Sequence, residues 1–147
     1  MKYILGCLLS FIPLVAFAQD RDYKFIAICG EANGNSYFES EHKWVEDGFK
    51  DGKIFFTYHF DTKTFDIITY NSVRDETFSM RADGGNVRLQ RVTDEDIVAT
   101  VEYWHGISVY TFYRNKNYFT YLESKNFRNT SRTSVFTGSC EYIERVQ

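Results

Sequence analysis

The residues of this chain best suited to chemistry are its three histidines, His42, His59 and His105. No two of them have the spacing of a helical zinc pair, in which two histidines four positions apart flank a glutamate. His59 is close in sequence to Asp61 and Asp66, and a histidine beside a carboxylate could support an acid–base or metal site. An exposed cross-strand ion pair accounts for the same residues more simply. We therefore expect no metal site and no cofactor.

The remaining polar clusters also lack the pattern that a reaction needs. The acidic run at 94–96 has neither the glycine nor the distal glutamate of a calcium loop. Ser134 and Ser139 have no neighbouring base to activate them. The sequence thus predicts a protein that is not an enzyme.

Two cysteines, Cys29 and Cys140, lie near the two ends of the part of the chain that follows the N-terminal apolar segment. Cys7 lies in the N-terminal apolar segment, so Cys29 and Cys140 are the two cysteines left once that segment is removed. In an oxidising compartment two such thiols most simply form one disulfide. We expect this bond to join the first strand to the last and so close the sheet on itself. A loop of 140 − 29 = 111 residues is worth about 4 to 5 kcal/mol in the chain-entropy description of disulfides.

The first 18 residues have the features of an export signal. A short cationic start precedes an apolar run that ends in Ala16-Phe17-Ala18, which is a typical cleavage site. The run is too short to span a bilayer as a helix and contains Pro13. The sequence therefore predicts a signal peptide over 1–18, a single barrel-like domain over 19–147, no stable membrane anchor, and a bacterial protein that is periplasmic or secreted.

Composition narrows the class of partner. The net charge is −3, so the chain lacks the excess of basic residues with which proteins bind nucleic acid. Aromatic residues make up 18% of the chain, and such residues favour the half-buried surfaces of β-sheets. The only proline lies in the predicted signal, so the sheet edges must be protected by pairing or closure.

Alternating apolar and polar residues predict eight to ten short strands. The clearest are 54–60, 65–70, 97–104, 107–113 and 118–123, with weaker ones at 23–29, 77–80, 87–92 and 135–142. The fold class is therefore all-β, a single antiparallel meander that forms a closed, lipocalin-like barrel or a sandwich. A capping-box spacing at 36–39 leaves one short helix near 36–46 as an alternative to an irregular strand. The polar segment 124–132 is expected to be a loop.

Three hairpin registers follow from the turns. A four-residue turn after Phe60 places Tyr58 opposite Ile67 and His59 opposite Asp66. A two-residue turn at 105–106 places Val101 opposite Tyr110. A two-residue turn at 115–116 directs residues 119 and 121 to the core, whereas a three-residue turn would reverse them.

In the second register Trp104, Tyr113 and Tyr118 lie on the face opposite the core. Exposed aromatic residues on a sheet face can form a recognition surface. We therefore expect a non-enzymatic binding protein whose partner is another protein, as for an inhibitor or an immunity protein. The alternative is a carrier of a small apolar ligand inside the barrel.

The layout of an exported β domain with one early and one late cysteine is similar in architecture to that of periplasmic inhibitors of c-type lysozyme. The Ser-Gly-x-x-Tyr motif of that family is absent, and the segment 84–87 does not replace it. A lipocalin-like layout is also compatible, although the Gly-x-Trp signature is missing from the first strand. No site residue is therefore carried over from either family.

Overall fold

The computed structural model describes residues 23–59, 62–127 and 130–143. The predicted signal peptide, 1–18, lies outside the described residues. Nine strands account for nearly all of them: β1 (Tyr23–Phe38), β2 (Lys43–His59), β3 (Thr64–Asn71), β4 (Glu76–Ser79), β5 (Asn86–Val92), β6 (Asp96–Tyr103), β7 (Gly106–Tyr113), β8 (Tyr118–Phe127) and β9 (Thr130–Ile143).

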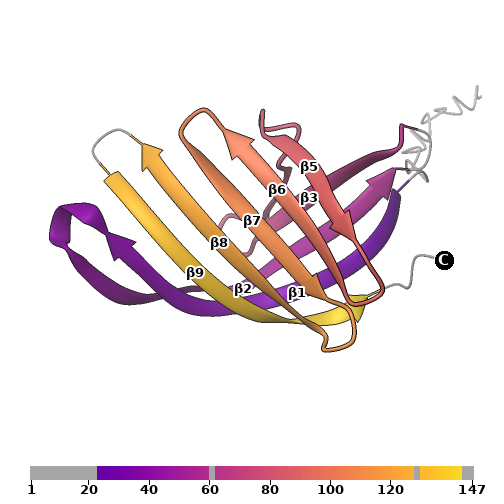
Figure 1. Cartoon of the computed structure of the whole chain (residues 1–147), viewed down its shortest axis with the longest axis horizontal. Helices are drawn as coiled ribbons and strands as arrows, with labels where there is room; N and C mark the ends of the chain where they lie inside the picture. The colour runs from indigo at the N-terminus through magenta and orange to yellow at the C-terminus, as the bar shows by residue number, and fades with distance from the viewer. Residues whose placement is uncertain (1–22, 60–61, 128–129, 144–147) are drawn as a thin grey trace, which may run out of the picture.

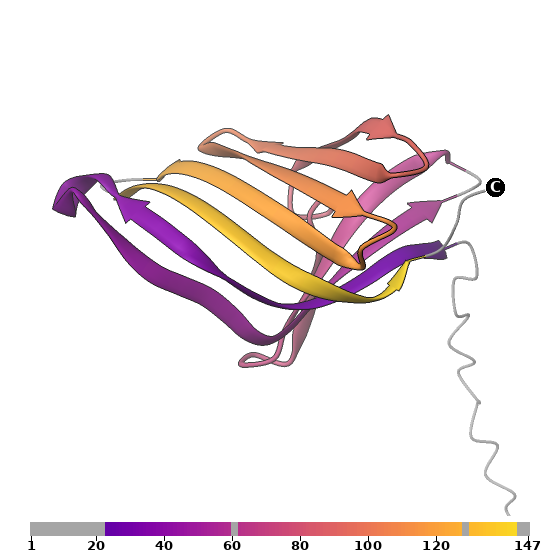
Figure 2. The ribbon, with the colours of Figure 1, turned by 60° about the horizontal axis from the view of Figure 1, so that its bottom comes forward.

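All nine strands belong to one antiparallel sheet, which curls strongly into a half-barrel (Figures 1 and 2). The strand order is β4-β3-β2-β1-β9-β8-β7-β6-β5. Each strand pairs with its neighbour in sequence, except that β4 and β5 do not pair and β9 pairs with β1. The prediction of an all-β, barrel-like meander is therefore confirmed.

The concave face of the sheet carries the core. Alternate residues of β6, β7 and β8 are buried, as the period of two requires. The largest fully buried apolar side chains are Phe56, Ile67, Ile97, Phe112 and Phe119. Phe56 packs edge-on against Phe112, with ring centroids 3.6 Å apart. This end of the half-barrel is thus filled by side chains.

Two hairpin registers differ from those expected. Tyr58 lies opposite Phe65, and Asp66 lies opposite Thr57. Val101 lies opposite Ser108 in the second hairpin. Both pairings are displaced by two residues because the turns occupy different positions from those assumed. A displacement of two keeps every side chain on its face, so the core residues are unchanged, but the expected pairing of His59 with Asp66 is wrong.

Two further expectations concern the far end of the sheet. Of the two alternatives for 36–46, the structure shows the irregular strand: β1 runs to Phe38, β2 begins at Lys43, and a single 3-10 turn, η1 (Glu39–Glu41), lies between them. The segment 124–132 is not a loop, because β8 continues to Phe127 and β9 begins at Thr130. The third hairpin does follow the two-residue alternative, with Phe112 opposite Phe119.

The seam of the half-barrel lies between β3 and β5, and Arg81 bridges it. Its Nη2 atom donates hydrogen bonds to the carbonyl oxygens of Phe65 on β3 (3.0 Å) and Val87 on β5 (2.6 Å). Buried Asp66 fixes the start of the segment between β4 and β5. Its carboxylate accepts hydrogen bonds from the Ser79 hydroxyl (2.5 Å) and from the backbone N–H of Arg81 (3.2 Å). The two sheet edges are thus joined by side chains where backbone pairing is missing.

We expect the substitution Arg81→Met to open this seam. Methionine keeps an apolar stem but cannot donate to the two carbonyl groups, which should lower the free energy of unfolding by about 1.5 kcal/mol. Hydrogen exchange should accelerate in β5 more than in β9. Arg88→Met, on the exposed side of β5, is the matched control and should cost less than about 0.5 kcal/mol. Equal costs for both variants would contradict the role of Arg81.

Candidate ligand cleft

A cleft of about 530 Å³ opens on the concave side of the sheet. Its walls come from β2, β3, β4 and the segment between β3 and β4, and its floor comes from β7 and β8. Most of the lining side chains are apolar or aromatic. They include Phe49, Ile54, Tyr70, Val73, Phe78, Met80, Tyr110 and Tyr121.

Irregularities in β1 and β2 create this space. Gly30 pairs with Lys53 but Ala32 pairs with Phe49, so the three residues 50–52 of β2 face a single residue of β1. Asp51, within this bulge, has φ of 58°. Bulges bend a strand and end its regular pairing, and β3 accordingly pairs with β2 only from Lys53 onwards. The first half of β2 therefore diverges from β3, and the cleft lies at the point of divergence.

The floor of the cleft contains a row of stacked rings. Tyr110 stacks on Tyr121 at a centroid distance of 4.6 Å, and Tyr121 stacks on Phe136 at 5.5 Å. Burial, followed by the nearby Glu123 carboxylate, raises the pKa of Tyr110. Burial also raises the pKa of Tyr121, with Tyr110 and Glu123 adding to the shift. Both hydroxyl groups are therefore neutral at physiological pH, and neither is a candidate base.

A buried carboxylate lies beside these rings. Glu123 is only 3% exposed. It accepts hydrogen bonds from the Tyr121 hydroxyl and from Arg132 Nη2 (2.7 Å), and forms an ion pair with Lys125. Burial alone would raise the pKa of Glu123, but the bonds from Lys125, Tyr121 and Arg132 outweigh it and lower that pKa. The group is thus held ionised, which makes it unsuited to act as a general acid.

Glu123 belongs to a buried polar row that crosses four neighbouring strands. Ser108 on β7, Glu123 on β8, Ser134 on β9 and Ser36 on β1 are successive cross-strand partners, and all four are buried. The hydroxyl groups of Ser36 and Ser134 are 2.7 Å apart, and Ser36 donates to Asp47 at 2.6 Å. The concave face is therefore apolar near the seam and polar near the η1 turn, with the cleft between these regions.

Six residues that line the cleft carry polar or charged side chains: Lys50, Asp51, Lys53, Thr69, Asn71 and Ser72. The Oγ1 atom of Thr69 is buried with no hydrogen-bond partner among the described residues. Lys50 and Lys53 line the rim, and Lys53 Nζ lies 3.3 Å from Glu141. Small-molecule sites combine apolar and aromatic walls with polar groups of this kind.

The three aromatic residues expected to form a binding surface do not lie together. Tyr113 and Tyr118 face each other across β7 and β8 and stack at 4.5 Å. Trp104, 83% exposed, follows β6 at the opposite end of that hairpin, beside His105. Seven residues of strand separate the two ends of β7, which is about 23 Å. The pair of tyrosines and Trp104 are thus separate surface features.

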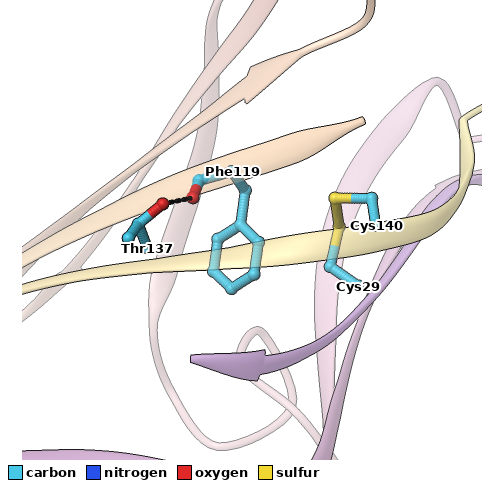
Figure 3. Close-up of a disulfide and its surroundings, with 4 residues drawn as sticks. All are labelled: Cys29, Phe119, Thr137 and Cys140. Atoms are coloured by element: carbon cyan, nitrogen blue, oxygen red, sulfur yellow. Dashed lines mark hydrogen bonds between the residues drawn. A yellow bond between two sulfur atoms is a disulfide. The ribbon is translucent and has the colours of Figure 1, made fainter. Parts of the chain in front are cut away.

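Cys29 and Cys140 form a disulfide, with their Sγ atoms 2.05 Å apart (Figure 3). They are cross-strand partners on β1 and β9, and both are buried. The Phe119 ring lies beside them, and the Thr137 hydroxyl donates to the Phe119 carbonyl oxygen at 3.1 Å. The bond joins the first and last strands as expected, but these strands are adjacent in the middle of the sheet order. The seam is closed by Arg81 instead.

The described residues contain no group of three or more histidine, cysteine, aspartate and glutamate side chains that could hold a metal ion. His42 and His105 lie in turns at the same end of the strands but on strand pairs separated across the sheet, whereas His59 lies at the other end, opposite Thr64. No helix in the part of the chain that the structure describes is long and apolar enough to cross a membrane.

Sequence reasoning did not identify the cleft or the Glu123 cluster. The available signal was the segment Lys50-Asp51-Gly52, which interrupts the alternation between two strand-like stretches. Such an interruption is typical of a bulge. Glu123 also carried a signal: with residues 119 and 121 directed to the core, the period of two places residue 123 on the same face, where an unpaired carboxylate would be costly.

Comparison with known proteins adds no functional assignment. No protein-family model matches the chain, and no curated protein matches it in sequence.

Proposed function

We propose that this protein is a non-enzymatic binder of a small, largely apolar ligand held in the cleft between β2, β3, β4 and the β7–β8 floor. The observation that carries the proposal is the cleft itself, about 530 Å³ in volume and lined mainly by apolar and aromatic side chains. Ligand sites in proteins typically measure about 300–1,000 Å³ and have such walls.

The chemistry of the floor favours binding over catalysis. The Tyr110 and Tyr121 hydroxyl groups are held neutral by burial. The Glu123 carboxylate is already engaged by three donors. A neutral phenol and a saturated ion pair can line a site but are poorly placed to exchange protons with a substrate.

The buried disulfide is compatible with an oxidising compartment. We propose that the protein acts after export, in the periplasm or outside the cell, where an apolar molecule needs a carrier or a sequestering protein. Protein purified from the exporting cell should then carry a bound small molecule, which native mass spectrometry would detect as a discrete added mass.

Phe78→Ser provides the mutational test of the cleft. Phe78 lines the cleft and is 42% exposed. Removing this part of the apolar wall should weaken binding of the neutral dye Nile red about tenfold, as expected for losing one partly buried aromatic contact. Fluorescence titration would measure the change.

The matched control for this test is Leu122→Ser. Leu122 is 44% exposed, but it is not a lining residue of the cleft. The control should bind Nile red as the unchanged protein does. Equal losses in the two variants, or no saturable binding by the unchanged protein, would refute the proposed function.

A further inference from the structure

The first half of β2 has a free edge. Residues 43–49, here called the outer edge of β2, pair continuously with β1 on one side. No other described strand pairs with them on the other side, because β3 begins its pairing at Lys53. In both ribbon views this part of β2 runs out to the η1 turn, away from β3 and β4 (Figures 1 and 2). A row of seven residues therefore presents backbone groups outward.

The two terminal strands of the sheet are short or bulged, whereas the outer edge of β2 carries charged side chains but is neither short nor interrupted. β4 has only four residues. β5 is interrupted by a bulge between Leu89 and Arg91, and it carries Arg88 as well. Short length, bulges and charged side chains are the usual protections of edge strands. Residues 43–49 form a longer, unbroken run with no proline, so this edge remains competent to add a strand.

The charge of the outer edge of β2 indicates which kind of partner strand would bind to it. The outer edge itself, 43–49, has one lysine and two acidic residues, a net charge of 1 − 2 = −1, and the adjoining segment 36–42 adds Glu39 and Glu41 without any lysine or arginine. Lys43 is already paired with Glu41 at 2.5 Å. Glu39 and Glu46 have no ion-pair partner among the described residues. Two copies meeting edge to edge would bring like charges together, whereas a basic strand would be attracted.

An exposed aromatic pair adds a second source of affinity for cations. Trp44, on the outer edge, is 57% exposed and packs against Tyr37 with ring centroids 5.4 Å apart. Lysine and arginine side chains bind favourably over such rings.

We propose that the outer edge of β2 binds an extended, basic segment of another protein by adding it as a strand to the sheet. The backbone of the partner would form hydrogen bonds with residues 43–49. Its lysine or arginine side chains would pair with Glu46 and pack over the Trp44 ring. Strand addition of this kind derives affinity from the main chain and specificity from alternate side chains. This site shares only Gly48 and Phe49 with the cleft of the ligand proposal, and Phe78 and the cleft floor take no part in it.

The test uses a synthetic peptide of alternating lysine and valine, seven residues long, and a matched peptide with glutamate in place of lysine. Backbone amide NMR signals of residues 43–49 should shift with the basic peptide and become protected from exchange. The acidic peptide should leave them unchanged. Binding of the basic peptide should weaken as salt increases, because the attraction is between exposed charges.

Two charge variants separate this site from general electrostatics. Glu46→Lys should weaken binding of the basic peptide about fivefold, the effect of reversing one exposed charge pair. Glu95→Lys makes the same change at an exposed position between β5 and β6 and should have no effect. Phe78→Ser should bind the peptide normally, so failure of the cleft proposal leaves this result unaffected.

Proline substitutions test the backbone contribution. Successive N–H groups of a strand point to opposite sides, so one of Val45→Pro and Glu46→Pro removes an outward donor and the other breaks the ladder with β1. The variant that retains thermal stability should lose peptide binding. Retained binding, equal binding of both peptides, shifts confined to other strands, or self-association through residues 43–49 without peptide would each overturn the proposal.

Discussion

Removal of the Cys29–Cys140 disulfide should lower the free energy of unfolding by about 5 kcal/mol. The bond closes a loop of 111 residues, and in the chain-entropy description a closure of that length is worth about this much. Small domains are stable by only about 5–15 kcal/mol in total. The loss would therefore leave the fold marginal at 37 °C.

Two experiments distinguish the contribution of the cross-link to stability from that of the two cysteine side chains. Reduction of the unchanged protein breaks the bond and leaves both sulfur atoms in place. The double variant Cys29→Ala/Cys140→Ala also removes buried volume, since both side chains are buried, and should cost somewhat more. Urea unfolding followed by tryptophan fluorescence would measure both. A loss below about 1 kcal/mol on reduction would contradict the expected contribution.

Glu123→Gln should lower the free energy of unfolding by about 3 kcal/mol. Glutamine leaves the partly covered Arg132 and Lys125 cations beside a neutral amide, and breaking a buried ion pair typically costs this much. Glu102→Gln is the matched control. Glu102 lies 3.9 Å from Arg88 in an exposed pair, and its loss should cost less than about 1 kcal/mol.

The cost of Glu123→Gln should depend on pH. The folded state lowers the pKa of Glu123 below its ordinary value of 4.5. The stabilisation from the ionised group is therefore fully present above that ordinary value and is lost as the pH falls through the folded pKa. Urea midpoints of the two proteins should differ most at pH 7 and converge only as the pH falls below 4.5 and through the lowered pKa of folded Glu123. A difference that does not change with pH would show that the ion pairs do not stabilise the fold.

Strands and buried faces were predictable because the β period is two. Residues such as Phe56, Ile97 and Phe112 belong to apolar series that recur at every second position, and each is buried on the concave face. The registers of two hairpins were displaced by two residues, since a turn with weak sequence preferences can start one residue earlier or later at each end. The buried faces were correct because such a displacement preserves them.

The extent of β8 and β9 was not predictable in the same way. Residues 124–132 are polar, which resembles a loop, yet most of them extend the hairpin with Lys125 opposite Arg132. Their polarity is accommodated because they flank the Glu123 ion pairs at the polar end of the concave face. A polar composition indicates that the side chains of a segment lie beside charged groups or water. It does not indicate whether the backbone of the segment is paired in a sheet.

The sequence by itself determined the all-β class, the buried face of each central strand and the pairing of Cys29 with Cys140, because alternation and the number of available thiols are local or countable properties. Tertiary structure alone decided the bridge between β3 and β5 through Arg81, the cleft beside the β2 bulge, the partners of the buried Glu123 carboxylate and the free outer edge of β2. Each of these depends on how strands distant in sequence diverge or meet. That geometry is set by sheet curvature and bulges, which leave little trace in a pattern of apolar and polar residues.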